Sequence, residues 1–144
     1  MTSLEERFSA ALHGSARGWR LAVDRRLKGL GMSQAAWMTV AVAAKARSPL
    51  AQVELAERVG VEGATMVAML DRLERAGLVR RSACASDRRV KHVTLTAAGE
   101  ALYARVRVEA AAVRGELLAG IDPKLLAAAT GLLERLQAGF DCDP

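Results

Sequence analysis

Basic residues are concentrated between Arg72 and His92, and their chemistry indicates a polyanionic partner. The stretch contains seven basic and two acidic residues, and its excess of five positive charges equals the net charge of the whole chain. The basic residues are Arg72, Arg75, Arg80, Arg81, Arg88, Arg89 and Lys91, and the acidic ones are Glu74 and Asp87. Clustered guanidinium and ammonium groups bind a phosphate backbone well, because neutralising phosphates releases condensed counterions. A solvated charged surface is the alternative interpretation.

Two short helices are expected just before and within this basic stretch. Apolar residues recur at helical spacing in two runs, and each run stops at a glycine, Gly60 or Gly77, which readily accepts the left-handed conformation that closes a helix. The apolar residues are Val53, Leu55, Ala56 and Val59 in the first run, and Met66, Val67, Leu70, Leu73 and Ala76 in the second. Two helices joined by so short a turn predict a helix-turn-helix, whose second helix has about four turns.

A change of period after Gly77 predicts a β-hairpin. Val93 and Leu95 alternate with polar residues, as in a strand that is buried on one face. The residues between the two expected strands, 85–89, are small or charged and suit an exposed turn. Arg88 and Arg89 place two guanidinium groups at the tip of this hairpin.

An ordered set of motifs resembles the MarR-type winged-helix transcriptional regulators. The motifs are Glu54-Leu55-Ala56, Asp71-Arg72-Leu73-Glu74, Gly77-Leu78-Val79, Asp87-Arg88-Arg89 and Leu95-Thr96-Ala97-Ala98-Gly99. The resemblance to the SlyA branch is carried by Cys84 to Arg89 at the hairpin, by Asp24 with Arg26-Leu27-Lys28, and by Trp37 after Ser33-Gln34. Together these motifs cover nearly the whole chain.

The resemblance implies a mainly α-helical fold with a small β-hairpin, in a single MarR-type domain of residues 1–144. A winged helix-turn-helix at residues 33–96 would bind DNA, and helical parts at residues 1–32 and 97–144 would form a dimer. Such proteins are homodimers that place their recognition helices in successive major grooves and their wings in the flanking minor grooves. The resemblance therefore implies a transcriptional regulator that binds a (pseudo)palindromic operator in double-stranded DNA.

The N-terminal part of a recognition helix meets base edges in such motifs, so the expected DNA-facing residues lie early in the second helix. They are Gly63, Ala64, Thr65, Ala68 and Arg72. SlyA-like sequences carry arginine where this chain has Ala68, so the strongest guanine-reading side chain is missing. We therefore expect sequence specificity to depend largely on the wing and on DNA shape.

The wing is expected to reach a narrow, A·T-rich minor groove, whose enhanced negative potential attracts guanidinium groups. Arg89 is the residue we expect to be inserted, with Arg88 beside it and Asp87 holding one of them in place. The remaining basic residues suit phosphate contacts or ion pairs with Glu74 and Asp87 better than base reading. They are Arg72, Arg80, Arg81 and Lys91.

Long amphipathic helices are expected at both ends of the chain. Apolar residues repeat at intervals of three or four from about Ser3 to Leu30, which predicts one long helix. Ser33 is the expected N-cap of a second helix through Ala44, and Thr96 is the expected N-cap of a helix at 97–119. A last helix is expected from Asp122-Pro123 onward, an N-cap followed by proline at the first helical position. The DNA-binding part of so small a chain cannot bury all these apolar faces, so packing between the subunits of a homodimer is expected. A compact monomer with an intramolecular helical pair is the alternative.

Trp37 is open to two interpretations, as ordinary core or as the wall of an effector cavity. SlyA-like regulators bind aromatic carboxylates between the dimerisation helices and the DNA-binding part, which implies a small aromatic carboxylate or phenolic effector. Arg17 and Arg20 are the candidate partners of its carboxylate. This chain has Ala41 where the SlyA pattern has histidine, so the ligand specificity of that branch does not carry over directly.

Composition places the chain among soluble globular domains, with 144 residues of which 51% are hydrophobic and 26% charged. No apolar run approaches the roughly 18 residues of a membrane span, and the first residues are too charged for a signal peptide. We therefore expect a cytoplasmic protein with no membrane partner. The spacing of Cys84 and Cys142 fits neither a disulfide framework nor a zinc site, so reduced thiols are expected, with no metal or other cofactor.

Catalysis is not expected, because His13 and His92 are the only histidines and no nucleophile with a base or pair of acids stands out. Two alternatives to a DNA-binding regulator of the ordinary kind remain open. One is a thiol-based redox sensor, which would need Cys84 to have a low pKa rather than to be buried and inert. The other is a winged-helix dimer that acts through a protein partner, which the weakened recognition helix keeps open.

Overall fold

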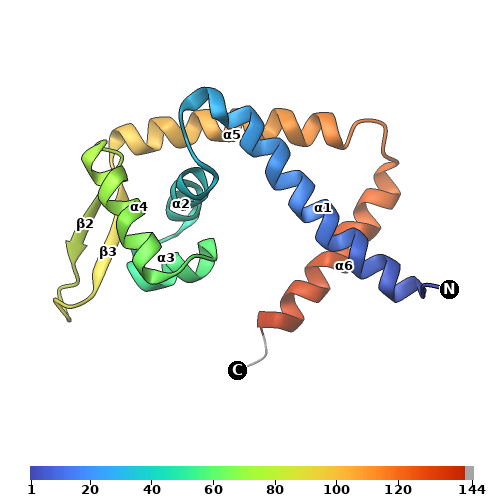
Figure 1. Ribbon diagram of the computed structural model, residues 1–144, viewed down its shortest axis with the longest axis horizontal. Coiled ribbons are helices and arrows are strands. Elements are labelled where there is room, and N and C mark those ends of the chain that lie inside the picture. The colour runs from blue at the N-terminus through green and yellow to red at the C-terminus, as the bar shows by residue number, and fades with distance from the viewer. Residues whose placement is uncertain (142–144) are drawn as a thin grey trace. The chain divides into compact units, whose positions relative to one another are not determined.

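The computed structural model describes residues 1–141, and Cys142 lies outside the described residues. The chain divides into two compact units, Met1–Val113 and Arg114–Pro144. The described part is mainly α-helical, with one antiparallel sheet of three short strands (Figure 1). The predicted fold class is therefore confirmed, although the sheet has one strand more than the predicted hairpin.

The first helix, α1 (Leu4–Leu27), begins with a capping box. The Ser3 hydroxyl accepts a hydrogen bond from the N–H of Glu6 at 3.2 Å, and the Glu6 carboxylate accepts one from the N–H of Ser3 at 2.7 Å. The chain then tightens into a 3₁₀ turn, η1 (Lys28–Leu30), and stops at Gly31, whose φ is 70°. The long helix predicted from about Ser3 to Leu30 is thus confirmed in extent, with a tighter last turn.

The second helix, α2 (Gln34–Lys45), starts where the sequence predicted an N-cap. The Ser33 hydroxyl accepts a hydrogen bond from the N–H of Ala36 at 3.2 Å. Val40 and Thr39 are fully buried on this helix, and Thr39 donates its hydroxyl hydrogen to the carbonyl of Ala35. α2 therefore supplies one wall of the core against which the DNA-binding part packs.

The predicted helix-turn-helix is confirmed as α3 (Gln52–Val59) and α4 (Gly63–Arg75). Between them Gly60 has a φ of 81°, and its N–H donates to the carbonyls of Ala56 and Glu57, which closes α3. No side-chain hydrogen bond caps the start of α4, whose N-cap residue is Glu62.

The buried residues of the helix-turn-helix differ from the apolar pattern at four positions. Val53, Val67 and Ala76 belong to that pattern, yet all three are exposed, Val53 by 69% and Val67 by 38%. Met69 was not part of it and is buried beside Leu70 and Leu73. The reason is that helical spacing alone does not determine which side of a helix is buried, and only the residues on the side facing α2 and the sheet find packing partners.

The hairpin consists of β2 (Val79–Ala83) and β3 (Lys91–Leu95), with Val79 paired to Leu95 and Ala83 to Lys91. A third strand, β1 (Leu50–Ala51), pairs antiparallel with β3, so that the strand order is β1-β3-β2. Because β1 is only two residues long, it has no alternating pattern from which the sequence could predict it.

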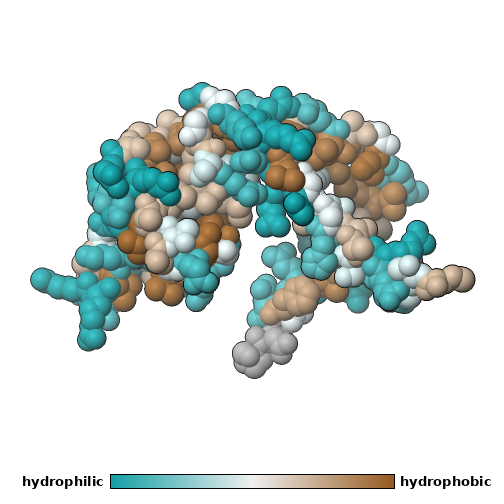
Figure 2. Space-filling view, in the orientation of Figure 1, coloured by the Kyte–Doolittle hydropathy of each residue, from teal (hydrophilic) through white to brown (hydrophobic). Residues whose placement is uncertain are grey.

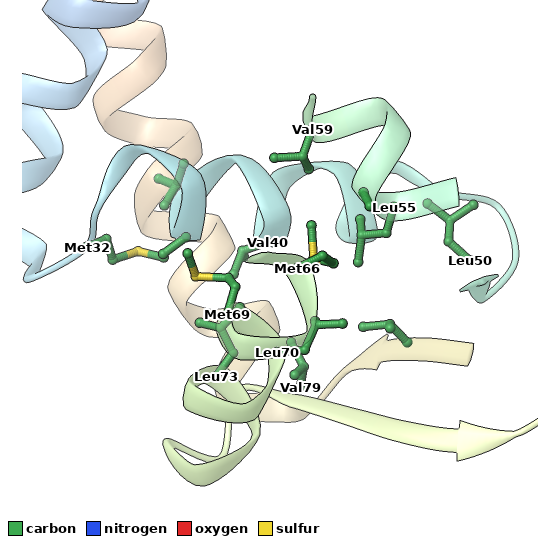
Figure 3. Packing of buried hydrophobic residues seen from close by; sticks show 14 of the residues in the cluster. Met32, Val40, Leu50, Leu55, Val59, Met66, Met69, Leu70, Leu73 and Val79 are labelled. Atoms are coloured by element: carbon green, nitrogen blue, oxygen red, sulfur yellow. The ribbon is translucent and has the colours of Figure 1, made fainter. Parts of the chain in front are cut away.

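The core of the first unit lies between α2, α3, α4 and the inner face of the sheet. Leu55, Met66 and Leu70 are fully buried and converge from α3 and α4 (Figure 3). Val79 and Val93 cover the inner face of the hairpin and are each 2% exposed. This packing holds α4 and the hairpin against the same hydrophobic core.

The helix α5 (Ala97–Leu117) follows β3 directly, and Thr96 caps it as predicted by accepting a hydrogen bond from the N–H of Gly99 at 3.1 Å. The last helix, α6 (Pro123–Asp141), begins after Asp122, whose carboxylate accepts from the N–H of Lys124. The predicted restart of a helix at Asp122-Pro123 is therefore confirmed.

Candidate nucleic-acid interface

The outer side of α4 carries the residues expected to face DNA. Gly63, Ala64, Thr65, Ala68 and Arg72 are all solvent-exposed. The opposite side of α4 is buried in the core and holds the helix firmly. Its residues Met66, Met69, Leu70 and Leu73 are at most 7% exposed. α4 therefore presents one side to a partner while the other is fixed in the core.

Arg75 is exposed on this same outer side, although sequence reasoning did not include it in the site. Successive residues of a helix are about 100° apart, which brings residue 75 within about 20° of residues 64 and 68 in projection along the axis. The Arg75 Nε also donates to the carbonyl of Asp71 at 3.3 Å. Projecting the sequence onto a helical wheel would have found Arg75.

The wing tip is a tight, charged turn that projects as the hydrophilic extension at the lower left of Figure 2. The Asp87 carboxylate accepts from the backbone N–H of Arg89 at 3.0 Å and lies 3.7 Å from the Arg89 Nε. The Arg89 side chain is 95% exposed. The N–H of Cys84 donates to the carbonyl of Val90 at 2.8 Å and closes the base of the turn.

Three further basic residues of the wing are exposed to solvent. They are Arg80, Arg88 and Lys91. Arg80 lies opposite Thr94 in the strand register, and Lys91 lies at the start of β3 opposite Ala83. These side chains add positive charge to the wing and are not committed to the core.

Arg81 differs from the other wing arginines because it is tied to α4. Its guanidinium donates to the carboxylates of Asp71 and Glu74, and its backbone N–H donates to Glu74 at 2.9 Å. Only 19% of the Arg81 side chain is exposed. The predicted pairing with Glu74 is present, the predicted pairing of a basic residue with Asp87 is made by Arg89, and the pairing with Asp71 was not predicted.

These contacts shift the pKa values of Glu74 and Arg81. Hydrogen bonds from the backbone and the side chain of Arg81 lower the pKa of Glu74. The hydrogen bond to Asp71 raises the pKa of Arg81, against the opposing effect of burial. Both shifts favour the charged forms, so the link between α4 and β2 is ionic at neutral pH.

Cys84 lies at the end of the wing strands, partly buried, as a free thiol. Its Sγ is 3.1 Å from the Ser86 hydroxyl oxygen. That hydrogen bond makes the largest contribution to lowering the pKa of the thiol, and hydrogen bonds from the backbone N–H groups of Ser86 and Asp87 lower it further. Cys84 is thus more acidic than an ordinary cysteine, which is one requirement of a thiol-based sensor.

A cavity of about 360 Å³ lies behind the C-terminal half of α4. Its walls are formed by Leu30, Gly31, Met32, Ser33 and Ala36 before and within α2, by Met69, Arg72 and Leu73 of α4 with its C-cap residue Ala76, and by Leu78 and Leu102. The walls are mainly apolar, and Arg72 is the one residue of formal charge among them. The recognition helix itself therefore forms part of a cavity large enough for a small aromatic molecule.

The residues predicted to form an effector pocket do not line this cavity. Arg17 and Arg20 are exposed on α1, whereas Trp37 packs against the core from α2. The indole N–H of Trp37 is buried and has no hydrogen-bond partner among the described residues. A role for these three residues in effector binding stays a prediction.

The described residues contain no group of three or more His, Cys, Asp or Glu placed to hold a metal ion. In the same part of the chain no helix is long and apolar enough to span a membrane.

Comparison with known proteins gives a consistent result. Residues 42–91 match the MarR family. The crystal structure of transcriptional regulator PA3341 is similar over 94% of this chain and 99% of that one, with 43% sequence identity and a TM-score of 0.84. A MarR-family transcriptional regulator from Silicibacter pomeroyi is similar over 96% of this chain and 92% of that one, with 26% identity and a TM-score of 0.80.

A more distant structure shares the fold. CouR from Rhodococcus jostii RHA1, bound to p-coumaroyl-CoA, is similar over 94% of this chain and 95% of that one, with 23% identity and a TM-score of 0.77.

Proposed function

Because this chain belongs to the MarR family of transcriptional regulators, we propose that it acts as a homodimer that recognises a (pseudo)palindromic operator in double-stranded DNA. One observation carries the proposal. An exposed helix α4 and an exposed basic wing lie on the same compact unit, and Arg81 links them by ion pairs to Asp71 and Glu74. Two DNA-facing elements held in a fixed relation can engage neighbouring grooves together.

Each element has a distinct role in this proposal. The outer side of α4 enters the major groove, and Arg72 and Arg75 contact phosphates at its edge. Arg89 enters the adjacent minor groove, with its backbone held by Asp87. Arg88 contacts phosphates beside it, as do Arg80 and Lys91.

The homodimer is supported by apolar side chains that are exposed near the chain ends. In the first unit Leu4 and Phe8 of α1 are 72% and 39% exposed. In the second unit Leu125, Leu133 and Phe140 of α6 are 64%, 43% and 76% exposed. Apolar surfaces of this kind mark association between subunits, and a dimer of two-fold symmetry matches a palindromic operator.

The first test is fluorescence-anisotropy binding to genomic duplex fragments, including the region upstream of the protein's own gene, between about 50 and 200 mM salt. We expect one or a few fragments to stay bound at the higher salt. If all fragments bind alike and dissociate together as the salt rises, sequence-specific recognition is excluded. Binding of a protein partner then becomes the leading proposal for the function of the winged helix.

The role of the wing is tested by Arg89→Ala. Each subunit of the dimer loses one phosphate-equivalent contact, which lowers the slope of log K against log salt by roughly 0.9 per subunit and weakens binding. Arg7→Ala on α1 removes the same charge outside the winged helix and is the matched control, which we expect to keep the wild-type slope. An unchanged slope and affinity for Arg89→Ala would remove this residue from the interface.

A small aromatic carboxylate or phenol is the proposed effector. The cavity behind α4 supports this, because Arg72 contributes to its wall and also lies beside the DNA-facing surface. A ligand anion that pairs with Arg72 would bias the position of the recognition helix. The SlyA-like alternative places the same ligand near Arg17, Arg20 and Trp37.

The two effector sites are distinguished by titrating 4-hydroxybenzoate into the protein–DNA complex. We expect release of the DNA from the wild-type protein, and a weaker response in a variant that has lost the anion partner. A response weakened by Arg72→Ala favours the cavity behind α4, whereas one weakened by Arg17→Ala or Arg20→Ala favours the SlyA-like site. Calorimetry without DNA separates ligand binding from the DNA affinity of each variant.

A further inference from the structure

The outer side of α4 is built from short apolar groups over its first two turns. Ala64, Val67 and Ala68 are exposed there together with the methyl and hydroxyl of Thr65, and we name these four residues the methyl face. From Gly63 onward the first charged residue of α4 is Asp71. The part of the helix that would lie deepest in a groove therefore offers methyl groups and a single hydroxyl.

The methyl face is left uncovered by the rest of residues 1–141. Val67 is 38% exposed, although its neighbours Met66 and Leu70 are buried. A Cβ at Gly63 would meet nothing within 4 Å, so no neighbouring group covers this position at the start of α4. The backbone of α4 can therefore approach a partner closely, at the cost in helix stability that apolar exposure and glycine bring.

The chemistry of the major groove decides what such a face can recognise. Guanine presents the acceptors N7 and O6, which arginine or lysine satisfies, while thymine presents a 5-methyl group that alanine, valine and the threonine methyl contact favourably. Guanine acceptors covered by methyl groups would lose their water without gaining a donor. The methyl face thus favours thymine and disfavours G·C pairs.

The surrounding charges indicate that the partner of the methyl face is DNA rather than another apolar surface. Arg72 and Arg75 follow the methyl face on the same helix, and the exposed Arg80, Arg88 and Arg89 lie on the wing. Basic groups next to an apolar helix face match the phosphates that border a major groove.

We propose that the methyl face reads the 5-methyl groups of thymine in the major groove and so selects A·T base pairs within each half-site. This inference rests on the proposed DNA-binding function and adds the class of sequence that α4 recognises. The wing then supplies affinity and minor-groove shape reading, and the methyl face supplies direct readout.

The test begins with selection of bound duplexes from a randomised pool, using the full chain at about 150 mM salt. The most enriched duplex is then synthesised with deoxythymidine or with deoxyuridine at each thymine of a half-site. Deoxyuridine keeps the base pair and removes only the 5-methyl group. Burying one such group is worth about 0.8 kcal/mol, so we expect the affinity to fall about fourfold at each contacted thymine.

A protein variant separates direct reading from an effect on folding. Ala68→Ser replaces part of the methyl face with a hydroxyl, and we expect the thymidine-to-uridine affinity ratio at its contact to fall from about four towards one. A general loss of helix stability weakens binding to both duplexes equally and leaves the ratio unchanged. Ala101→Ser, at an exposed position of α5, is the matched control and should keep the wild-type ratio.

The outcomes distinguish this inference from the function on which it rests. If no sequence is enriched and binding is lost at 150 mM salt, the proposed DNA-binding function fails, and the inference fails with it. If a sequence is enriched but binds equally well with either base, the regulator stands and thymine reading is overturned. A ratio of about four that persists in Ala68→Ser overturns the assignment of the contact to Ala68.

Discussion

Arg81 and Arg89 belong to the same wing, yet their side chains are 19% and 95% exposed. Arg81 donates to two carboxylates of α4, while Arg89 has one carboxylate of its own turn 3.7 Å from its Nε. A guanidinium that already satisfies two carboxylates has little to offer a phosphate, whereas an exposed one held only loosely exchanges its partner at low cost. Residue type alone did not separate these two roles.

Cys84 provides a prediction about thiol reactivity. Because the Ser86 hydroxyl and two backbone N–H groups lower its pKa, Cys84 carries more thiolate near neutral pH than an ordinary cysteine and should be alkylated faster. Ser86→Ala removes the largest contribution, so we expect the pKa to rise and the iodoacetamide rate at pH 7 to fall. Peptide mass spectrometry follows Cys84 separately from Cys142.

The matched control for this prediction is Ser82→Ala, an exposed serine of β2. It should leave the pH midpoint of Cys84 alkylation unchanged. Equal midpoints for Ser86→Ala and the wild type would show that the hydroxyl does not stabilise the thiolate. A redox-sensing function would then lose its chemical basis.

At the scale of elements, Arg81 determines how the wing is held against α4. We expect Arg81→Ala to reduce the free energy of unfolding by no more than about 1 kcal/mol, since the side chains of its partners Asp71 and Glu74 are 43% and 40% exposed and solvent screens the ion pairs. DNA affinity should fall because the wing is no longer fixed, while the salt slope stays near the wild-type value. Anisotropy at several salt concentrations measures both quantities.

Arg80→Ala is the comparison for this experiment, because Arg80 is adjacent in sequence but exposed. Its loss should lower the salt slope by roughly 0.9 for each subunit of the dimer if it contacts a phosphate. A slope that falls equally in the two variants would mean that Arg81 contacts DNA directly.

The junction between the hairpin and α5 depends on Gly99. A Cβ at this position would lie 2.0 Å from the carbonyl oxygen of Leu78, which leaves no room for any side chain. We expect Gly99→Ala to destabilise the protein by about 1–3 kcal/mol, because the start of α5 must move away from the wing. Chemical denaturation measures the change.

Gly115→Ala tests the same substitution elsewhere in α5, where a Cβ meets nothing within 4 Å. There alanine should stabilise the helix by about 0.5–1 kcal/mol. Opposite signs for the two variants identify the close approach to Leu78 as the cause, whereas destabilisation by both would point to a general intolerance of α5 to substitution.

At the scale of the whole molecule, the exposed apolar residues of α1 and α6 predict self-association. Phe8→Glu places a charge in the expected interface, so we expect the dimer to dissociate at micromolar concentration and to lose cooperative operator binding. Sedimentation equilibrium measures the association. Ala10→Glu, about 200° around α1 from Phe8, is the control and should remain dimeric.

A dimer that survives Phe8→Glu would show that α1 contributes little to the interface. A wild-type protein that sediments as a monomer at all concentrations would contradict the homodimer itself. The exposed residues of α6 would then need another partner.

The sequence by itself determined most of the secondary structure of the described residues. Ser33 and Thr96 cap their helices, and Asp122 precedes a helix that begins at proline, as predicted. Gly60 and Gly77 have positive φ where the helices of the helix-turn-helix end. These features were predictable because a cap or a turn depends on hydrogen bonds between residues only a few positions apart.

The tertiary structure decided what depends on residues distant in sequence. It paired Arg81 with Asp71, added β1 to the hairpin, and buried Met69 while leaving Val67 exposed. It also made Arg72 part of a cavity wall. Sequence periodicity shows which residues share a side of a helix, but only the packing of the helix against its neighbours determines which side is buried and which charges meet.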